Sequence, residues 1–396
     1  MVSVISDNLV GNFICTTDKC EDTCCKHWSM QMNTQMFAKY KEEAPELVDC
    51  VESDNDNSFI MRKDKATSYC VKFDNGKCSI HSEYGEKFLG DACYFYPRIT
   101  RKAGDNVIMT ATMSCPEIAR IALFSDKPFS KNESSASRLP QEIRNILPDE
   151  TSFSDFISVH NIFLEVMEEA ASKSDKIFAR INSVCRSLEK IDRKDWAGAA
   201  SLYFRLADSS IPKSEENIND PFNLLHALCG LVVASKKSLP PRLKQTIYEM
   251  EKALSVKLDW ENILINADES SLAAYNKLRD LWNSGVGDFY EPILKRWLAA
   301  QISAASFPFA GLGDKLSDKV TIIGFRLAML KLALISAHHI NIGDKNNKLS
   351  EGDIIRIVQS LSRFLDHLAG PEFLLKICSE TGWGRESRML GLLSWQ

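Results

Sequence analysis

The sequence predicts a mainly α-helical protein, in which a small cysteine-rich α+β metal-binding module is followed by a multi-helix domain. Nine of the twelve cysteines lie within the first 115 of 396 residues. Beyond position 150, apolar residues recur at spacings of three and four, which is typical of helices with one buried face. The intervening stretch is rich in Ser, Lys and Pro, as linkers are. We therefore expect a cysteine-rich domain over 1–124, a linker over 125–150 and an all-helical domain over 151–396.

Composition indicates a globular protein without a nucleic-acid or membrane partner. The chain is 44% hydrophobic and 26% charged, with a net charge of −5, so there is no basic excess for nucleic acid. The most apolar run, Thr321–Ala337, contains Arg326 and Lys331 and is too short for a free membrane span, which favours a core helix. The first residues, MVSVISDNLVGN, lack the basic and apolar regions of a secretory leader. We expect a cytoplasmic protein.

Thiols gathered at this density form either a disulfide framework or a site for a soft metal or an iron–sulfur cluster. A reducing compartment disfavours disulfides. A chain of this length also buries a large core without crosslinks, whereas disulfide-dense proteins are usually small and secreted. We therefore prefer metal ligation to disulfide formation.

The first cysteines require a tightly turned backbone. Val2–Ile14 is β-tolerant and is expected to form an edge strand that leads into Cys15. Four thiols then fall within eleven residues, and the Thr and Asp residues between them suit tight turns. Because neighbouring side chains point in different directions, the adjacent Cys24 and Cys25 can serve different metal atoms or different sites.

The rest of the module is expected to alternate short strands and helices. Asp74-Asn75-Gly76 is a strong turn motif, which predicts a hairpin with Cys70 and Cys78 facing one another at its ends. Tyr96-Pro97 is expected to end regular structure. The predicted helices are Thr34–Glu43, His81–Leu89 and Pro116–Leu123, and the predicted strands are Phe59–Lys65 and Ser68–Phe73.

Residues 41–57 form an acidic segment with seven Asp and Glu residues. Charge runs of this kind are usually solvated loops. The alternative is an acidic rim beside a site, in which Glu42, Glu43 and Glu46 attract a lysine side chain.

The second domain is predicted from helical periodicity and from capping motifs such as Ser350-x-x-Asp353. Cys185, Cys229 and Cys378 lie among apolar neighbours and are expected to be inert core thiols. The expected helices are Ser154–Ala171 and Lys176–Ile191, followed by helices near 196–207, 221–237, 241–257, 269–283, 289–304, 318–339, 351–368 and 371–379.

Several separated sequence blocks occur in the order found in one known family. They are CEDTCCKHW, CVKFDNGKCSIH, YGEKFLGDACYFYPR and SCPEIAR, and a weaker block, YEPILKRWLAAQISAASFPF, lies in the helical part. In these blocks the chain resembles the flagellin lysine-N-methylase family, which is related to a broader class of zinc- or iron-chelating cysteine-cluster proteins. The resemblance implies methyl transfer from S-adenosylmethionine to lysine side chains of flagellin or another protein substrate. It also implies an iron–sulfur cluster, [4Fe–4S] in preference to zinc, held by N-terminal cysteines.

The resemblance further implies which thiols are ligands. Cys50 lies outside every matching block and is left out, and His27 and His81 are not assigned as ligands. Eight candidates exceed the four thiolates that one zinc ion or one [4Fe–4S] cluster requires, so two sites, or one site with additional redox or structural thiols, are both open. The implied metal ligands are Cys15, Cys20, Cys24, Cys25, Cys70, Cys78, Cys93 and Cys115.

No motif identifies the donor pocket or a catalytic base. The Cys-x3-Cys-x2-Cys spacing of radical S-adenosylmethionine enzymes is absent. A polar transfer needs a neutral lysine amine, and Tyr94, Tyr96 and Tyr290 are among many side chains able to assist it, so we assign no base. The Gly-x-Gly-Asp turns at 284–288 and 310–314 either present backbone N–H groups to the donor or simply connect helices. No convincing strand precedes either turn, which argues against a Rossmann-type domain. The alternative to an enzyme is a non-catalytic metal-binding or redox interaction protein.

Overall fold

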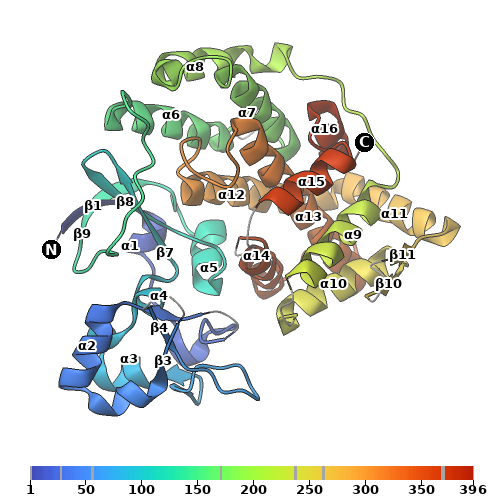
Figure 1. Cartoon of the computed structure of the whole chain (residues 1–396). Helices are drawn as coiled ribbons and strands as arrows, with labels where there is room; N and C mark the ends of the chain where they lie inside the picture. Colours follow the sequence, from blue (N-terminus) through green and yellow to red (C-terminus); the bar gives the residue numbers. More distant parts are fainter. Residues whose placement is uncertain are drawn as a thin grey trace.

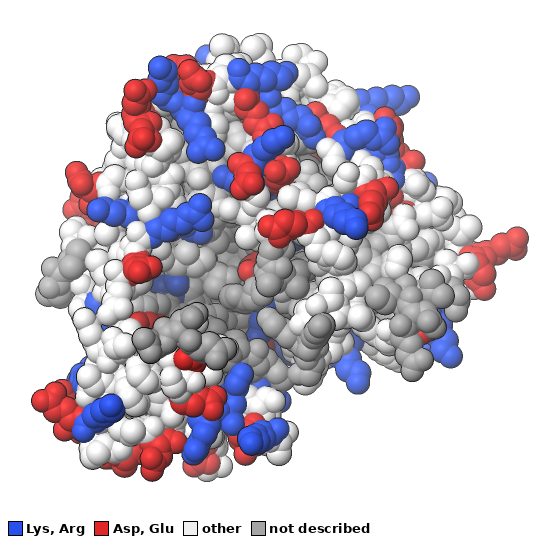
Figure 2. All heavy atoms as spheres, in the orientation of Figure 1, with Lys and Arg blue, Asp and Glu red and all other residues white. Residues whose placement is uncertain are grey.

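The computed structural model of the chain describes residues 2–26, 29–54, 58–169, 172–235, 239–260, 264–366 and 371–395. Helices dominate it, which confirms the mainly α-helical prediction. Figure 1 shows a small module at the lower left, a β-sheet above it and a helical domain that makes up most of the molecule. Acidic and basic side chains are interspersed over the face drawn in Figure 2, which is hollowed between the small module and the helical domain.

A four-stranded sheet connects the N-terminus to the helical domain. β1 is parallel to β8, with Ile5 beside Ile108, and antiparallel to β9. β1 therefore lies inside the sheet, and the prediction of an edge strand is wrong. The cause is β9, which lies within the segment expected to be a linker and whose sequence, KNESSA, lacks alternating apolar residues. The strand order β7-β8-β1-β9 corresponds to Arg98–Ala103, Asn106–Ala111, Val2–Asp7 and Lys131–Ala136.

The two apolar cores of the protein do not follow the predicted boundary between a cysteine-rich and a helical domain. The large core of the helical domain continues into the sheet, since Ile108 of β8 belongs to it, and so do Leu9 and Ile118 from the helices that follow β1 and β8. A second, smaller core contains only residues between Met30 and Phe88. The small module is thus the part of the cysteine-rich region that packs on itself, whereas the sheet and α5 (Pro116–Phe124) pack with the helices.

The small module is built around α2 (Thr34–Glu43), which has the predicted bounds. The Asn33 side chain caps this helix by accepting a hydrogen bond from the Met36 amide at 2.7 Å. The Tyr40 hydroxyl donates to the Phe88 carbonyl at 2.7 Å and so fixes α2 against the following segment. The other elements are α3 (Ser79–Tyr84), α4 (Asp91–Phe95), β2 (Gln31–Met32), β3 (Val51–Ser53), β4 (Phe59–Met61), β5 (Phe73–Asp74) and β6 (Lys77–Cys78), with 3-10 turns at Thr17–Lys19, Pro45–Cys50 and Glu86–Phe88.

The predicted hairpin turn is present, but its register differs from the prediction. Asn75 and Gly76 have φ angles of 47° and 82°, as a two-residue hairpin turn requires. Phe73, rather than Cys70, lies opposite Cys78. The two cysteines therefore do not face one another across the hairpin, because its strands are only two residues long.

The helix expected over His81–Leu89 is also shorter than predicted. α3 ends at Tyr84, and Gly85 follows with a φ of 77°, a backbone conformation that favours glycine and ends the helix. A 3-10 turn takes up the rest of the expected range.

The helical domain begins after the sheet and agrees with the predicted order of helices. One further helix, α16, was not expected from periodicity because it follows a short turn at the C-terminal end. β10 (Lys257–Asp259) and β11 (Leu264–Asn266) form a small hairpin, α1 (Asn8–Gly11) follows β1, and a π-turn at Trp282–Val286 joins α11 to α12. The helices are α6 (Phe153–Glu165), α7 (Ser174–Leu188), α8 (Trp196–Leu206), α9 (Asp220–Ala234), α10 (Pro241–Ala253), α11 (Glu269–Leu281), α12 (Gly287–Ala305), α13 (Leu316–Asn341), α14 (Glu351–Leu365), α15 (Glu372–Glu380) and α16 (Glu386–Ser394), with short 3-10 turns at Val166–Glu168, Arg193–Asp195 and Ala207–Ser209.

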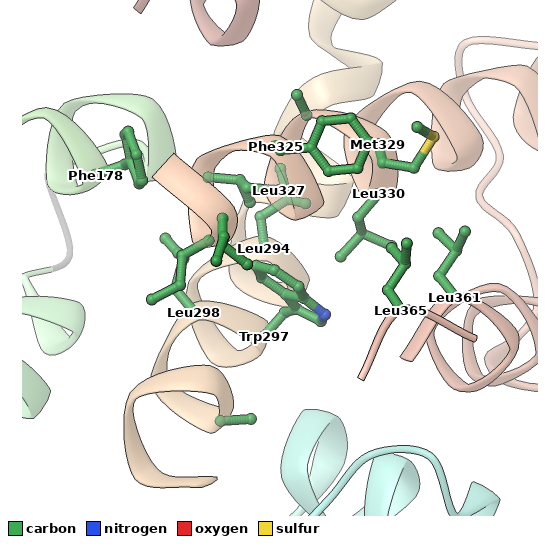
Figure 3. Close-up of a cluster of buried hydrophobic side chains, with 14 of the residues drawn as sticks. Phe178, Leu294, Trp297, Leu298, Phe325, Leu327, Met329, Leu330, Leu361 and Leu365 are labelled. Carbon is green, nitrogen blue, oxygen red and sulfur yellow. The ribbon is translucent and has the colours of Figure 1, made fainter. Parts of the chain in front are cut away.

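α13 runs through the centre of this domain. Its length and composition would allow it to cross a membrane, but its apolar stretch is buried by neighbouring helices. The prediction that Thr321–Ala337 forms a core helix is therefore confirmed. Figure 3 shows Phe325 and Leu327 of α13 in the buried cluster that also contains Trp297 of α12 and Leu361 of α14.

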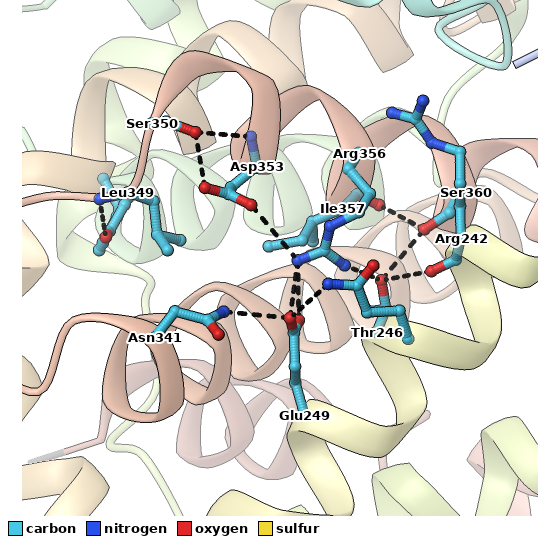
Figure 4. Close-up of polar contacts among 12 residues, drawn as sticks. Arg242, Thr246, Glu249, Asn341, Leu349, Ser350, Asp353, Arg356, Ile357 and Ser360 are labelled. Atoms are coloured by element: carbon cyan, nitrogen blue, oxygen red, sulfur yellow. Dashed lines mark hydrogen bonds and ion pairs between the residues drawn. The ribbon is translucent and has the colours of Figure 1, made fainter. Parts of the chain in front are cut away.

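A buried polar network ties α10, α13 and α14 together (Figure 4). The Arg356 guanidinium of α14 donates to both carboxylate oxygens of Glu249 at 2.9 Å and to Thr246 Oγ1 at 3.1 Å. Asn341 of α13 donates to the same carboxylate at 3.1 Å. Because removal of either buried charge would leave the other without its partner, this network fixes the relative positions of the three helices.

Candidate functional site

Seven of the eight predicted metal-ligand cysteines line a single cavity of about 370 Å³, which we call the thiol cavity. It lies where the small module meets α5 and the start of β7. Cys70 is outside the lining, yet its backbone amide donates to the Cys25 carbonyl at 2.9 Å, so it is adjacent to the cavity wall. The cysteines of the lining are Cys15, Cys20, Cys24, Cys25, Cys78, Cys93 and Cys115.

Four segments carry these thiols into the cavity. The loop before β2 supplies the first four, and the 3-10 turn Thr17–Lys19 gives it the tight bend that the sequence predicts. Cys78 ends β6, Cys93 lies in α4 and Cys115 is the N-cap residue of α5. Residues distant in sequence are therefore brought together by the hairpin, by α4 and by the sheet that places α5.

Burial makes the protonated thiol the favoured form over most of the cavity. Burial raises the pKa of Cys78 and Cys93, and it raises the pKa of Cys70 and Cys115 to about 12. Neighbouring thiolates add to this effect, because like charges disfavour one another. Positive charge placed among these sulfurs would instead favour the thiolate form over the thiol. A bound metal ion has this effect on its cysteine ligands.

Cys24 and Cys25 behave as a hydrogen-bonded pair. A hydrogen bond from the Cys24 side chain lowers the pKa of the Cys25 thiol, and a hydrogen bond from Thr23 and the charge of Arg363 lower it further. The pKa of Cys24 is raised by that same hydrogen bond and then by burial. Cys25 is therefore disposed to be a thiolate, in contrast to Cys24, Cys78, Cys93 and Cys115.

The spacing of the thiols is wider than a single metal ion needs. Among the residues that the structure describes, no three His, Cys, Asp or Glu side chains converge as a group able to hold one ion. Four sulfurs around one zinc each lie about 2.3 Å from it, so they must nearly touch one another. The thiols here instead surround a cavity of about 370 Å³, which suits a ligand of several atoms better than a single ion.

The loop of the first cysteines is held by α14 of the helical domain. Arg363 Nη1 donates to Asp22 Oδ2 at 2.5 Å, and its Nη2 donates to the Lys26 carbonyl at 2.9 Å. Gln359 donates to the same Asp22 oxygen at 2.9 Å and to the Ser114 carbonyl at 3.0 Å. One turn of α14 thus fixes both the cysteine loop and the segment that leads to Cys115.

Two further arginines reach the same loop from other helices. Arg120 of α5 pairs with Glu21 in the loop and with Glu351 of α14 at 2.6 Å. Arg242 of α10, beside the buried network of Figure 4, donates to the Glu21 carbonyl at 3.0 Å. Sequence reasoning did not find any of these anchoring residues, because each lies at least about a hundred positions from its partner.

The remaining site predictions have mixed outcomes. His81 lines the thiol cavity, whereas His27 lies outside the described residues. Cys50 is buried in the core of the small module and does not line the cavity. The three cysteines expected to be inert are buried in the helical domain, as predicted: Cys185, Cys229 and Cys378.

The three tyrosines considered as assisting groups fall in different places. Tyr94 and Tyr96 line the thiol cavity, and burial raises the pKa of Tyr96 well above its usual value. The Tyr96 hydroxyl lies 3.2 Å from Ser114 Oγ. Tyr290 is buried between α12 and α13, where its hydroxyl lies 2.8 Å from His338 Nδ1, so it belongs to the core.

The described residues of the acidic segment do not line the thiol cavity. Glu42 and Glu43 are exposed at the end of α2, and Glu46 accepts a hydrogen bond from the Tyr84 hydroxyl. Residues 55–57 of the segment lie outside the described residues. The carboxylates that do line the cavity are Glu86 and Glu117, which the sequence analysis did not single out.

Comparison with known proteins places most of the chain in one family. The model of the FliB lysine N-methylase C-terminal domain matches residues 153–392, which is more than half of the chain. The flagellar biosynthetic protein FliU of Salmonella muenchen is 24% identical over 33% of this chain and 88% of its own length. Lysine-N-methylases of Salmonella choleraesuis and Salmonella typhimurium are each 22% identical over 30% of this chain and 31% of their own length. The match thus spans about a third of those two enzymes.

No solved structure matches the chain. The family model begins at the first helix of the helical domain and ends within its last. This domain supplies Arg242 and Arg363, two of the three arginines that hold the cysteine loop. The chain belongs to the FliB lysine N-methylase family.

Proposed function

We propose that this protein is a protein-lysine N-methyltransferase that takes its methyl group from S-adenosylmethionine and carries an iron–sulfur cluster of the [4Fe–4S] type in the thiol cavity. The substrate is flagellin or another protein with accessible lysines. The observation that carries the proposal is the union of two features: a family-matched helical domain, and a cavity with seven cysteines whose loop that domain holds in place.

The donor set supports a cluster in preference to zinc. Its ligands would come from the cysteines of the cavity and from Cys70, which adjoins it. Thiolate sulfurs are the common ligands of iron–sulfur clusters, and such a cluster supplies a redox-active centre and binding energy that stabilises the surrounding fold. We propose that the cavity cysteines are metal ligands rather than disulfide partners, and such a role fits a reducing, cytoplasmic location.

The transfer itself needs little covalent chemistry from the protein. The lone pair of the neutral lysine nitrogen forms a bond to the methyl carbon, the carbon–sulfur bond breaks, and S-adenosylhomocysteine leaves with the bonding electron pair. The surplus proton on nitrogen passes to a base or to water. The protein's tasks are therefore to favour loss of a proton from the lysine ammonium, to exclude water and to align donor and acceptor.

Residues at the thiol cavity suit the recruitment of a cationic side chain. Glu86 is exposed and Glu117 half-buried, and both line the cavity. Carboxylates at a cavity mouth raise the local concentration of cations such as lysine. Glu117 also accepts from Arg120 at 3.3 Å, so Glu86 is the carboxylate with the greater effect on an incoming charge.

Mass spectrometry of flagellin tests this proposal. The protein is purified without oxygen, its iron and acid-labile sulfide are measured, and it is incubated with flagellin and S-adenosylmethionine. We expect methylated lysines that depend on both donor and protein. Absence of added methyl groups in the presence of an intact cluster would instead favour a non-catalytic metal-binding or redox interaction protein. Stoichiometric zinc without sulfide would replace the cluster by a structural zinc site.

A further inference from the structure

A second cavity, of about 520 Å³, adjoins the thiol cavity. The two cavities share a wall made of Tyr96, Pro97 and Arg98, at the start of β7. The second cavity lies between β7, the C-terminal half of α12 and the turn at 310–314. We call it the arginine cavity, after the four arginines in its lining: Arg98, Arg101, Arg144 and Arg326.

The positive charges that line the arginine cavity outnumber the negative charges in its lining. Its lining contains four arginines and one carboxylate, Asp366, which pairs with Arg326 at 2.9 Å. Across the described part of the chain, no carboxylate lies within ion-pair distance of Arg98, Arg101 or Arg144. Cations gathered at a cavity repel one another and attract anions, so this arrangement favours an anionic ligand.

Arg101 is half-buried, whereas Arg144 is exposed. Arg101 donates to the Ala304 carbonyl at 2.5 Å and lies 3.3 Å from Ser306 Oγ, which orients its guanidinium at the edge of α12. Burial, and then the charge of Arg144, lower its pKa to about 10. A carboxylate bound between Arg101 and Arg144 would relieve this repulsion and could accept two hydrogen bonds from each planar guanidinium.

The size and the walls of the cavity indicate an organic anion. Inorganic phosphate would leave most of 520 Å³ unfilled, and small-molecule sites commonly fall between about 300 and 1,000 Å³. Apolar side chains complete the lining, among them Phe95, Ile99 and Leu312. Of the two Gly-x-Gly-Asp turns, only 310–314 borders this cavity. Gly311 is part of the lining, and its φ of 113° is a conformation that favours glycine.

We propose that the arginine cavity binds an organic anion with an apolar body and that, given the methyltransferase function proposed above, this ligand is the methyl donor. Its carboxylate lies against Arg101 and Arg144, and its nucleoside lies along the apolar wall. The shared wall at Tyr96 then sets the donor next to the thiol cavity. The inference deepens the proposed function by giving the donor a site on a fold that lacks a Rossmann-type sheet.

Calorimetric binding of two related nucleosides to the full-length protein tests the assignment. S-adenosylhomocysteine carries the carboxylate, whereas methylthioadenosine keeps the thioether nucleoside and lacks it. Arg144→Ala is the test variant, since Arg144 is exposed and its side chain supports no other described residue. Arg144→Lys keeps the charge. Arg205→Ala on α8 removes an exposed arginine that lines neither cavity and serves as the matched control.

We expect Arg144→Ala to weaken S-adenosylhomocysteine binding about tenfold, as the loss of a charged hydrogen bond implies, and to leave methylthioadenosine binding unchanged. Arg144→Lys should restore part of the loss, and Arg205→Ala should bind as the wild type does. Equal weakening of both ligands, no weakening of either, or no binding of S-adenosylhomocysteine to the wild type would overturn the assignment.

Methyllysine formation on flagellin separates this inference from the proposed function. If flagellin is methylated and Arg144→Ala binds the donor product normally, the donor site lies elsewhere and the function stands. If carboxylate-dependent binding requires Arg144 but no lysine is methylated, the site stands and the function fails.

Discussion

Arg363 Nη1 donates to Asp22 Oδ2 at 2.5 Å, and this contact joins α14 of the family-matched helical domain to the loop that carries the first four cysteines. The two residues are 341 positions apart in the chain. The second guanidinium nitrogen donates to the Lys26 carbonyl at 2.9 Å, so one side chain spans the cysteine loop. The geometry of the thiol cavity therefore depends on the helical domain as well as on the small module.

Arg363→Ala should loosen this loop. Loss of a charged hydrogen bond costs about 1 to 3 kcal/mol in the free energy of unfolding, because the half-buried Asp22 carboxylate keeps the neutral Gln359 amide but loses its charged partner. We also expect the cavity thiols to react faster with a thiol reagent in the metal-free protein. The control is Arg385→Ala, which removes an exposed ion pair with Glu215 and should change neither stability nor labelling by much. Labelling rates equal to those of the wild type would show that α14 does not order the loop.

Cys24→Ala and Cys70→Ala distinguish a cavity ligand from a thiol beside the cavity. Cys24 lines the thiol cavity, whereas Cys70 lies beside it in the core of the small module, with its amide donating to the Cys25 carbonyl. Because cluster binding contributes to folding, we expect Cys24→Ala to lose most of its iron and sulfide and to become sensitive to protease in the small module. Cys185→Ala removes a buried thiol of the helical domain and should retain the cluster.

Metal analysis of Cys70→Ala then decides the ligand set. Loss of iron equal to that in Cys24→Ala assigns Cys70 to the cluster, and retention of iron confines the ligands to the cavity lining. Full retention of iron and sulfide in both variants would refute the thiol cavity as the cluster site.

Local patterns in the sequence predicted local structure well. α2 has the predicted bounds because an Asn cap and helical periodicity agree there, and α13 is a core helix because its apolar run is continuous. β9 was missed because its residues are polar on both faces, so it is identified as a strand by its pairing with β1 and not by its sequence pattern. The hairpin at Asn75 was predicted, but its length was not, since turn residues fix a turn and not the extent of its strands.

The sites depend on contacts that no local pattern encodes. The density of cysteines predicted a site where the thiol cavity lies. Arg363 and Gln359, which hold the cysteine loop, lie on α14, and the periodicity of that helix predicts which of its residues are buried but not which residues they contact. The arginine cavity likewise joins Arg101 of β7 to Arg326 of α13, more than two hundred positions away. Neither set of residues has a sequence motif, because each is defined only by the tertiary fold.

Glu86→Gln should weaken the recruitment of a lysine-bearing substrate. Glu86 is an exposed carboxylate at the thiol cavity, so its loss should raise KM for flagellin about two- to fivefold at low salt and leave kcat nearly unchanged. The effect should shrink as salt is added, because added ions screen exposed charges. Glu42→Gln combined with Glu43→Gln is the control, since these residues lie away from the cavity. A larger effect from that pair would restore the acidic segment as the recruiting surface.

Lys331 gives a prediction for the pH dependence of stability. Its ammonium lies on α13, 4.6 Å from the ring centre of Trp282 and 4.9 Å from that of Trp395, and it donates to the Leu393 carbonyl at 2.6 Å. Burial lowers the pKa of Lys331 to about 8. In the unfolded chain the pKa returns to about 10.4. Between these values the unfolded state holds more protons than the folded state, so the free energy of unfolding gains from this group as pH rises.

Lys331→Met isolates that contribution. Below pH 8 the folded protein bears the full cost of a buried ammonium, and above about pH 10.4 it bears none, a difference on the order of 3 kcal/mol. Other groups titrate in the same range, including the buried thiols, so the measured quantity is the difference in free energy of unfolding between wild type and variant, taken from urea titrations at several pH values.

From pH 8 to pH 10 the free energy of unfolding of the wild type should rise relative to that of the variant. Between pH 6 and pH 7.5, where Lys331 is protonated in both the folded and the unfolded state, the urea midpoint of the wild type should not rise relative to that of the variant. A constant difference across the whole range would show that Lys331 stays charged in the folded protein and that its two tryptophans and the Leu393 carbonyl offset its burial.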